Sequence, residues 1–182
     1  MTTFLLPWGC LWVLLTSACG STPNPTAQRA APSVSHSLPQ TPVKMERVNL
    51  DGESVALQAY LGQVVVVTYF ATWCIPCARL VSLMDRLANG TQAIKGLRTL
   101  PISVDRRPKS VLPDFVKSQR IRGMLVLGNR AERRGRTPFG RIDGLPTTFL
   151  IDPQGIPVEK WVGEVPAAYL RRRIATLLEE QK

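Results

Sequence analysis

Apolar residues are spaced as in a strand and then as in a helix near the middle of the chain. Residues 64–70 form an uncharged run rich in β-branched and aromatic side chains, which predicts a buried strand. The apolar residues that follow recur every three or four positions, at Leu80, Leu83, Met84 and Leu87. This spacing predicts a helix, and the pair Asn89-Gly90 predicts its end.

Similar patterns predict the rest of a folded domain. Residues 48–50 and 55–57 flank Asp51-Gly52, which indicates a β-hairpin, and a helical turn ending at Gly62 follows. The remaining patterns predict strands at 97–105, 124–127, 147–152 and 156–162, helices at 110–120 and from Pro166 onward, and a helix or loop at 130–142. Because strands and helices alternate, we expect an α/β domain with a central mixed β-sheet flanked by helices.

The first 18 residues have the pattern of an export signal. Residues 4–18 are uncharged and mostly apolar but too short for a transmembrane helix of about 20 residues, so 1–18 is predicted to be a signal peptide. The following Cys19 sits in a stretch, 16–20, that resembles a bacterial lipobox, which implies lipidation of Cys19. Two features depart from that pattern: Thr16 replaces the usual leucine, and no Lys or Arg precedes Arg29. A plain cleaved signal and an uncleaved anchor are the alternatives.

The next segment differs from both of its neighbours. Residues 19–43 contain five prolines among polar residues and show no apolar period, which predicts a disordered tether. The only histidine of the chain, His36, lies there, and we assign it no role. Residues 44–182 are predicted to form a single folded domain.

Positive charge is concentrated in one part of this domain. The formal net charge is +10, and residues 95–141 hold thirteen Lys or Arg against three Asp or Glu, which accounts for all of it. The excess indicates a solvated face or, alternatively, a docking surface for an acidic partner or an anionic membrane. We expect no nucleic acid partner, because the arginines are not interleaved with aromatic residues and no binding motif accompanies them.

The cysteines carry the chemistry that the sequence predicts. Of the four, Cys10 and Cys19 precede the domain, and Cys74 and Cys77 lie two residues apart between the predicted strand and helix. A cysteine at a helix N-terminus is stabilised as a thiolate by unpaired N–H groups and the helix dipole. One helical turn also brings Cys77 near Cys74, so the pair can form a disulfide and exchange it with other molecules.

Three motifs resemble those of a known family. Residues 61–67 read Leu-Gly-Gln-Val-Val-Val-Val, residues 71–77 read Ala-Thr-Trp-Cys-Ile-Pro-Cys, and residues 144–149 read Gly-Leu-Pro-Thr-Thr-Phe. Over about residues 45–180 the chain resembles the thioredoxin fold, and within it the TlpA/ResA-like periplasmic thiol-disulfide oxidoreductases. The resemblance implies a cis peptide bond before Pro146 and a central insertion between Cys77 and Pro146. It also implies active-site support from Trp73, Pro76, Leu145, Pro146 and Thr147.

The same resemblance implies a mechanism and a setting. Cys74 is expected to be the nucleophile and Cys77 the resolving cysteine of an enzyme that exchanges disulfides with protein thiols and with an upstream electron donor or acceptor. Ile75 and Pro76, between the two cysteines, carry no charge. The pattern therefore favours a reductant, of the kind used in cytochrome c maturation. We expect an exported, periplasmic monomer, tethered to a membrane only through Cys19, with no cofactor and no metal.

One position departs from thioredoxin. The residue six positions before the first cysteine is a buried acid there and is Thr68 here, which cannot act as a carboxylate base. Thr68 is therefore expected to be a strand residue with a locally bonded hydroxyl, and Glu159 or Glu164 are the candidate replacement acids. Two other functions stay open at this point: a Cu(I)-binding module that uses both thiolates, and a thiol peroxidase.

Overall fold

The computed structural model of the protein describes residues 38–180. The predicted signal peptide, Cys19 and most of the predicted tether lie outside these residues. Nine strands are present in the described part: β1 (Glu46–Asn49), β2 (Ser54–Ala56), β3 (Val64–Phe70), β4 (Leu97–Ser103), β5 (Val126–Leu127), β6 (Arg136–Thr137), β7 (Gly140–Arg141), β8 (Thr147–Ile151) and β9 (Pro157–Val162). The helices described are α1 (Ile75–Asn89), α2 (Pro108–Gln119), α3 (Ala167–Glu179) and the short 3₁₀ helices η1 (Leu57–Tyr60) and η2 (Glu132–Arg134).

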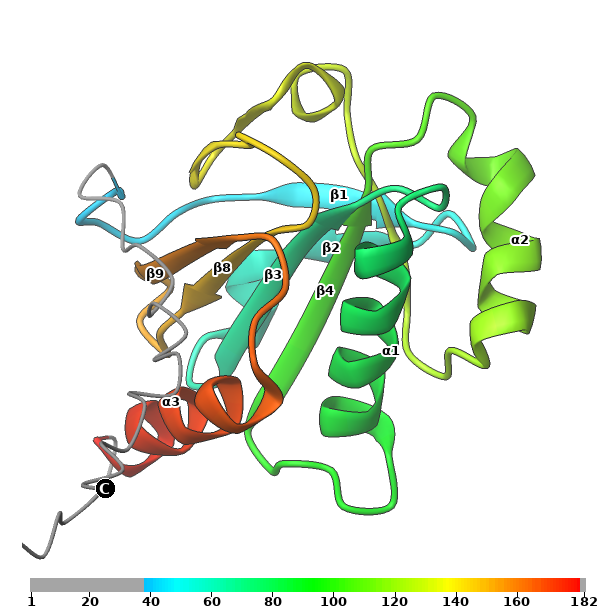
Figure 1. The fold of residues 1–182 in the computed structure, drawn as a ribbon. Helices are drawn as coiled ribbons and strands as arrows, with labels where there is room; N and C mark the ends of the chain where they lie inside the picture. The colour runs from blue at the N-terminus through cyan, green and yellow to red at the C-terminus, as the bar shows by residue number, and fades with distance from the viewer. Residues whose placement is uncertain (1–37, 181–182) are drawn as a thin grey trace, which may run out of the picture. The chain divides into compact units, whose positions relative to one another are not determined.

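Seven of these strands form one mixed sheet in the order β2-β1-β5-β4-β3-β8-β9 (Figure 1). The central strand β3 pairs in parallel with β4 along its whole length, from Val64 opposite Leu97 to Phe70 opposite Ser103. On its other side β3 pairs with the antiparallel strand β8, with Tyr69 opposite Thr147. The prediction of a mixed sheet flanked by helices is confirmed, and β3 lies in its middle, entirely buried.

The three α-helices cover one face of this sheet. Apolar side chains of α1 and α3 pack with Val64, Val66 and Leu150 in one core cluster. Leu112 and Phe115 of α2 pack with Phe70 and with both cysteines in a second cluster. The opposite face, with Val67, Tyr69 and Phe149, is covered by residues before β1, by Leu57 of η1 and by Phe139. The dithiol helix α1 is thus held between β3 and α2.

Some predicted elements have different bounds in the structure. The predicted strand 124–127 contains only Val126–Leu127 as regular strand, because β5 pairs with β4 at just two positions, Ile102 and Ser103. The stretch 130–142, predicted as a helix or loop, is the 3₁₀ helix η2 followed by a small hairpin of β6 and β7. The side chain of Phe139 at the hairpin tip is fully buried against Phe149, which fixes the hairpin on the sheet.

A buried carboxylate also fixes this insertion. The side chain of Glu132 is fully buried and accepts hydrogen bonds from Arg47 Nε and Nη2, each at 2.9 Å, and from the Tyr69 hydroxyl at 2.9 Å. The backbone N–H of Asn129 donates to the same carboxylate at 2.8 Å. Burial, with Glu132 beside it, raises the pKa of Tyr69 well above its ordinary value, so the phenol stays a donor. Glu132 therefore joins the insertion to β1 and β3.

No helix among residues 38–180 is both long enough and apolar enough to span a membrane.

Removing this carboxylate is expected to destabilise the fold. Glu132→Ala leaves the Arg47 charge largely buried and unpaired, and should lower the free energy of unfolding by about 3 kcal/mol. The measurement is urea unfolding followed by circular dichroism. Arg134→Ala is the matched control, since Arg134 is an exposed neighbour in η2, and should change the free energy by less than about 0.5 kcal/mol. Equal small effects of both substitutions would contradict a structural role for Glu132.

Candidate active site

The two cysteines lie at the junction between the central strand and the helix that follows it. After β3 ends at Phe70, the N–H of Cys74 donates to the carbonyl of Ala71 at 3.1 Å, which closes a tight turn. Cys74 is the N-cap of α1, and its Sγ accepts a hydrogen bond from the N–H of Cys77 at 3.3 Å. Pro76 occupies the first turn of α1, where a missing N–H costs nothing. The sulfur of Cys74 is therefore positioned by strand, turn and helix together.

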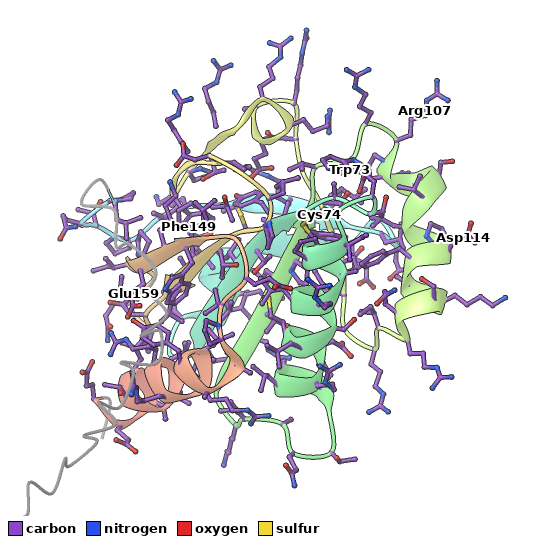
Figure 2. All side chains as sticks on the ribbon, in the orientation of Figure 1. Trp73, Cys74, Arg107, Asp114, Phe149 and Glu159 are labelled. Atoms are coloured by element: carbon purple, nitrogen blue, oxygen red, sulfur yellow. A yellow bond between two sulfur atoms is a disulfide. The ribbon has the colours of Figure 1, made fainter. Side chains whose placement is uncertain are left out.

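Cys74 and Cys77 are joined by a disulfide, with an S–S distance of 2.11 Å. Cys77 is completely buried, whereas Cys74 retains 7% of its surface exposed. The residues on either side of Cys74 are much more open: Trp73 is 75% exposed and Ile75 is 71% exposed. Figure 2 shows Trp73 and Cys74 at the N-terminal end of α1. Of the two cysteines, only Cys74 retains any exposed surface, beneath an exposed apolar rim.

The third motif, residues 144–149, reaches the same end of the sheet. The Leu145–Pro146 peptide bond is cis, as the family resemblance implies. The Thr147 side chain is buried and its hydroxyl donates to the carbonyl of Gly144 at 2.6 Å, while the Pro146 carbonyl accepts from the N–H of Gly163 at 2.7 Å. Because Thr147 pairs with Tyr69, Pro146 lies level with the end of β3.

Leu145 connects this loop to the dithiol. Its side chain packs against the core cluster that contains Cys74 and Cys77, and also against the cluster on the opposite face of the sheet. The structure thus brings Leu145, Pro146 and Thr147 to the dithiol end of the sheet, as the resemblance implies. Trp73 projects into solvent and is the most exposed large apolar residue of the described part.

A carboxylate that the sequence analysis missed holds the loop before Cys74. Asp105, 6% exposed, accepts from the backbone N–H of Thr72 at 3.1 Å and from the Thr72 hydroxyl at 3.1 Å. The Ser103 hydroxyl also donates to this carboxylate, at 2.9 Å. Since β3 and β4 are parallel and in register, the residues that follow Phe70 and Ser103 must meet. An acid just beyond the neighbouring strand was the sequence signal that could have revealed Asp105.

Thr68 has the local role expected of it. It is fully buried, and its Oγ1 lies 2.9 Å from Thr148 Oγ1 and donates to Met84 Sδ at 2.9 Å. Neither candidate acid occupies its place. Glu159 lies on β9 opposite Leu150 and accepts hydrogen bonds from Tyr169 and Arg173 of α3. Glu164 is ion-paired with Arg79 at 2.6 Å on the surface. The structure gives no support to either acid as a partner of the dithiol.

Two charged residues near the active loops, Arg79 and Asp143, have ion-pair partners. Arg79, two residues after Cys77, is neutralised by Glu164. Asp143, just before the proline loop, lies 2.5 Å from the Nζ of Lys160, and this hydrogen bond lowers the pKa of Asp143 below its ordinary range. Among residues 38–180, no group of three or more His, Cys, Asp or Glu side chains could hold a metal ion. The site therefore presents a sulfur pair beneath an apolar rim, with the Asp105 carboxylate as a charged group that contacts the loop before Cys74.

Known proteins are similar to this chain in sequence and in fold. A family model for the thioredoxin-like domain matches residues 53–178. The thiol-disulfide oxidoreductase ResA of a Bacillus cereus strain is 29% identical over 116 residues, which cover 64% of this chain and 64% of ResA. The chain thus spans somewhat less than two thirds of the length of the curated relatives that it matches first.

Solved structures agree on the fold. A thiol:disulfide interchange protein of the thioredoxin family from Chlorobium tepidum TLS is 25% identical, with a TM-score of 0.63, and the match covers 82% of this chain and 98% of that one. A secreted thiol-disulfide isomerase from Corynebacterium glutamicum has a TM-score of 0.67 at 19% identity, covering 87% of this chain and 96% of that one. With the family model matching most of its length, the chain belongs to the thioredoxin-like domain family.

Proposed function

We propose that this chain is a thiol-disulfide oxidoreductase that exchanges disulfides with protein substrates through Cys74 and Cys77. The observation that carries the proposal is the asymmetry of the disulfide: Cys74, the N-cap of α1, retains some exposed surface, and Cys77 is completely buried. A structural disulfide needs no such asymmetry, whereas an exchanging one needs a sulfur that another molecule can reach. The ResA relative, which carries the same activity in its name, supports the proposal.

The two sulfurs have different tasks in the proposed reaction. The Cys74 thiolate attacks one sulfur of a substrate disulfide, forms a mixed disulfide, and releases the other substrate sulfur as a thiolate that takes up a proton. Cys77 then loses its proton and attacks Cys74 Sγ. The Cys74–Cys77 disulfide forms and the substrate leaves with both of its sulfurs reduced. The reverse sequence oxidises a substrate dithiol at the expense of the Cys74–Cys77 disulfide.

The surroundings of Cys74 favour a protein as the substrate. Trp73 and Ile75 expose most of their apolar surface on either side of the sulfur. Large exposed aromatic side chains beside a reactive group are typical of surfaces that bind other proteins. We infer that Trp73, with the loop of Leu145, Pro146 and Thr147, supports the substrate chain while Cys74 reacts.

The direction of the reaction follows from what stabilises the Cys74 thiolate. The helix N-terminus and the N–H of Cys77 do so, but Ile75 and Pro76 add no charge and Arg79 is offset by Glu164. A moderately stabilised thiolate is typical of a reductant, so we propose reduction as the physiological direction, in cytochrome c maturation or a similar process.

Redox titration should then give a potential closer to about −270 mV than to about −120 mV; a value at the oxidising end would reverse the direction.

The place of action is proposed from the sequence. The signal pattern of residues 1–18 and the lipobox-like stretch around Cys19 support export to the periplasm and a lipid anchor.

Mass spectrometry of the protein purified from membranes tests the proposed anchor directly. A mature N-terminus at an acylated Cys19 supports the anchor, and an unmodified Cys19 contradicts it.

Turnover and trapping together test the proposed chemistry. The wild type should catalyse reduction of insulin by dithiothreitol, whereas Cys74→Ser should reduce the rate to background. Cys77→Ala should accumulate a mixed disulfide on Cys74, because no second sulfur resolves it. The measurement is non-reducing electrophoresis with mass spectrometry of the adduct. If Cys74→Ala traps substrate on Cys77 equally well, the assigned roles are wrong.

Asp105 is expected to act by positioning the loop before Cys74. Asp105→Ala removes all three hydrogen bonds to the carboxylate, and should lower kcat/KM for insulin about 10- to 100-fold. Asp105→Asn keeps an oxygen for the Thr72 N–H and should retain most of the activity. If the Asp105 carboxylate instead transfers protons, Asp105→Asn will lower kcat/KM as much as Asp105→Ala, because both substitutions remove the titratable group. The pH profile of kcat/KM for both variants distinguishes these outcomes.

A further inference from the structure

A wide groove lies beside the start of α2, away from the dithiol itself. Its volume is about 730 Å³, and β1, the loop before α2 and the loop after β5 form its walls. Its floor is apolar: Val48 on β1 is 44% exposed, pairs with Leu127 on β5, and lies near Pro108 at the start of α2. The groove therefore combines an uncovered part of the sheet with two flanking loops.

Basic side chains surround this apolar floor. Arg106, Arg107 and Lys109 line the groove and are exposed, and none of the ion pairs found in residues 38–180 involves them. Arg133 lines it as well, and its guanidinium donates to the backbone carbonyl of Gly128 and is in none of these ion pairs. The fifth cation, Arg47, is neutralised by Glu132.

Acidic side chains are nearly absent from the same walls. The one acid that lines the groove is Glu46, which accepts a hydrogen bond from Ser54. Four cations without a carboxylate partner thus face one carboxylate across a surface that also exposes apolar side chains. Such a surface complements a segment that carries acidic residues together with an apolar one.

The groove is connected to the active site through Asp105. This carboxylate holds Thr72, two residues before Cys74, and Arg106 and Arg107 follow it directly. Trp73 and Arg107 lie at the same end of the domain in Figure 2. The chain path from Cys74 through Thr72 and Asp105 to Arg107 spans at most about 20 Å, which six residues of extended peptide can cover.

We propose that this groove docks an acidic, extended segment of the protein whose disulfide meets Cys74. The inference rests on the proposed function and adds a substrate class to it: partners with an acidic stretch about six residues from the reacting cysteine. It also gives a role to four of the thirteen basic residues in 95–141, the four that line the groove. Electrostatic attraction between the groove and the acidic segment would mainly raise the rate of association, and salt would weaken this attraction.

Binding of a cysteine-free peptide tests the docking without any redox chemistry. The probe is a fluorescein-labelled peptide with four acidic residues and one leucine, measured by anisotropy with the oxidised wild-type protein. Arg106→Glu/Arg107→Glu/Lys109→Glu should weaken binding about tenfold or more at low salt. Acidic side chains are favourable at the start of a helix, so this variant is expected to fold, which circular dichroism verifies.

A matched control changes the same charge elsewhere. Lys117→Glu/Arg122→Glu/Arg171→Glu replaces three exposed cations outside the groove and should leave peptide binding within about twofold of wild type. Equal weakening by both triple variants would show that only net charge matters and would overturn the groove as a site. Tight binding to anionic lipid vesicles but none to the peptide would overturn the proposal in favour of a membrane surface.

Turnover separates this inference from the proposed function. Wild type should reduce a peptide disulfide with an acidic flank faster than one with a neutral flank, and the groove variant should lose that preference. Equal rates for the two peptides in wild type would contradict the inference alone, because exchange itself still occurs. If the reduced wild type, freed of dithiothreitol, does not form its Cys74–Cys77 disulfide and release two thionitrobenzoates from 5,5′-dithiobis(2-nitrobenzoate), the proposed function fails, whether or not the acidic peptide binds.

Discussion

The pairing of β3 with strands on both sides is the constraint on which the rest of the structure depends. Its end, at Phe70, is fixed by β4 on one side and by β8 on the other. Everything that the active site needs begins where these strands end: the cysteine turn after β3, Asp105 after β4, and the proline loop before β8. A fully buried strand cannot shift its register without exposing apolar side chains, so these three segments keep their relative places.

That constraint produces two chemically different sulfurs from two identical residues. Cys74 lies at the N-terminus of α1, where the N–H of Cys77 donates to its sulfur and the residue retains some exposed surface. Cys77 lies one turn further into the helix and is packed among Phe70, Val81 and Leu112. Position alone thus separates a sulfur suited to attack another molecule from one suited to complete the exchange.

Much of this could be predicted from the sequence because the signals are local. The run at 64–70, the helical spacing after it and the motifs at 71–77 and 144–149 identify the strand, the helix and the loop that meet at the site. The role of Asp105 was not predicted, because it depends on the register between β3 and β4, and the one local signal is an acid at the end of the neighbouring strand. The same holds for Glu132 and Phe139: a charged and polar stretch gives no periodic signal, although its two buried side chains fix it to the sheet.

The basic groove and the dithiol lie in different parts of the domain. The dithiol has an exposed apolar rim, and Arg79 beside it is ion-paired, whereas four cations without a carboxylate partner line the groove beyond Asp105. This division leaves the reactivity of Cys74 to the helix N-terminus and leaves partner choice to a neighbouring surface.

The most direct test of this account is the pH dependence of alkylation of the reduced protein, followed by mass spectrometry at each cysteine. The account predicts that Cys74 reacts first, with a midpoint below the ordinary thiol pKa of about 8.5, while Cys77 stays protected. A midpoint for Cys74 at or above that value, or equal reaction of both cysteines, would contradict it.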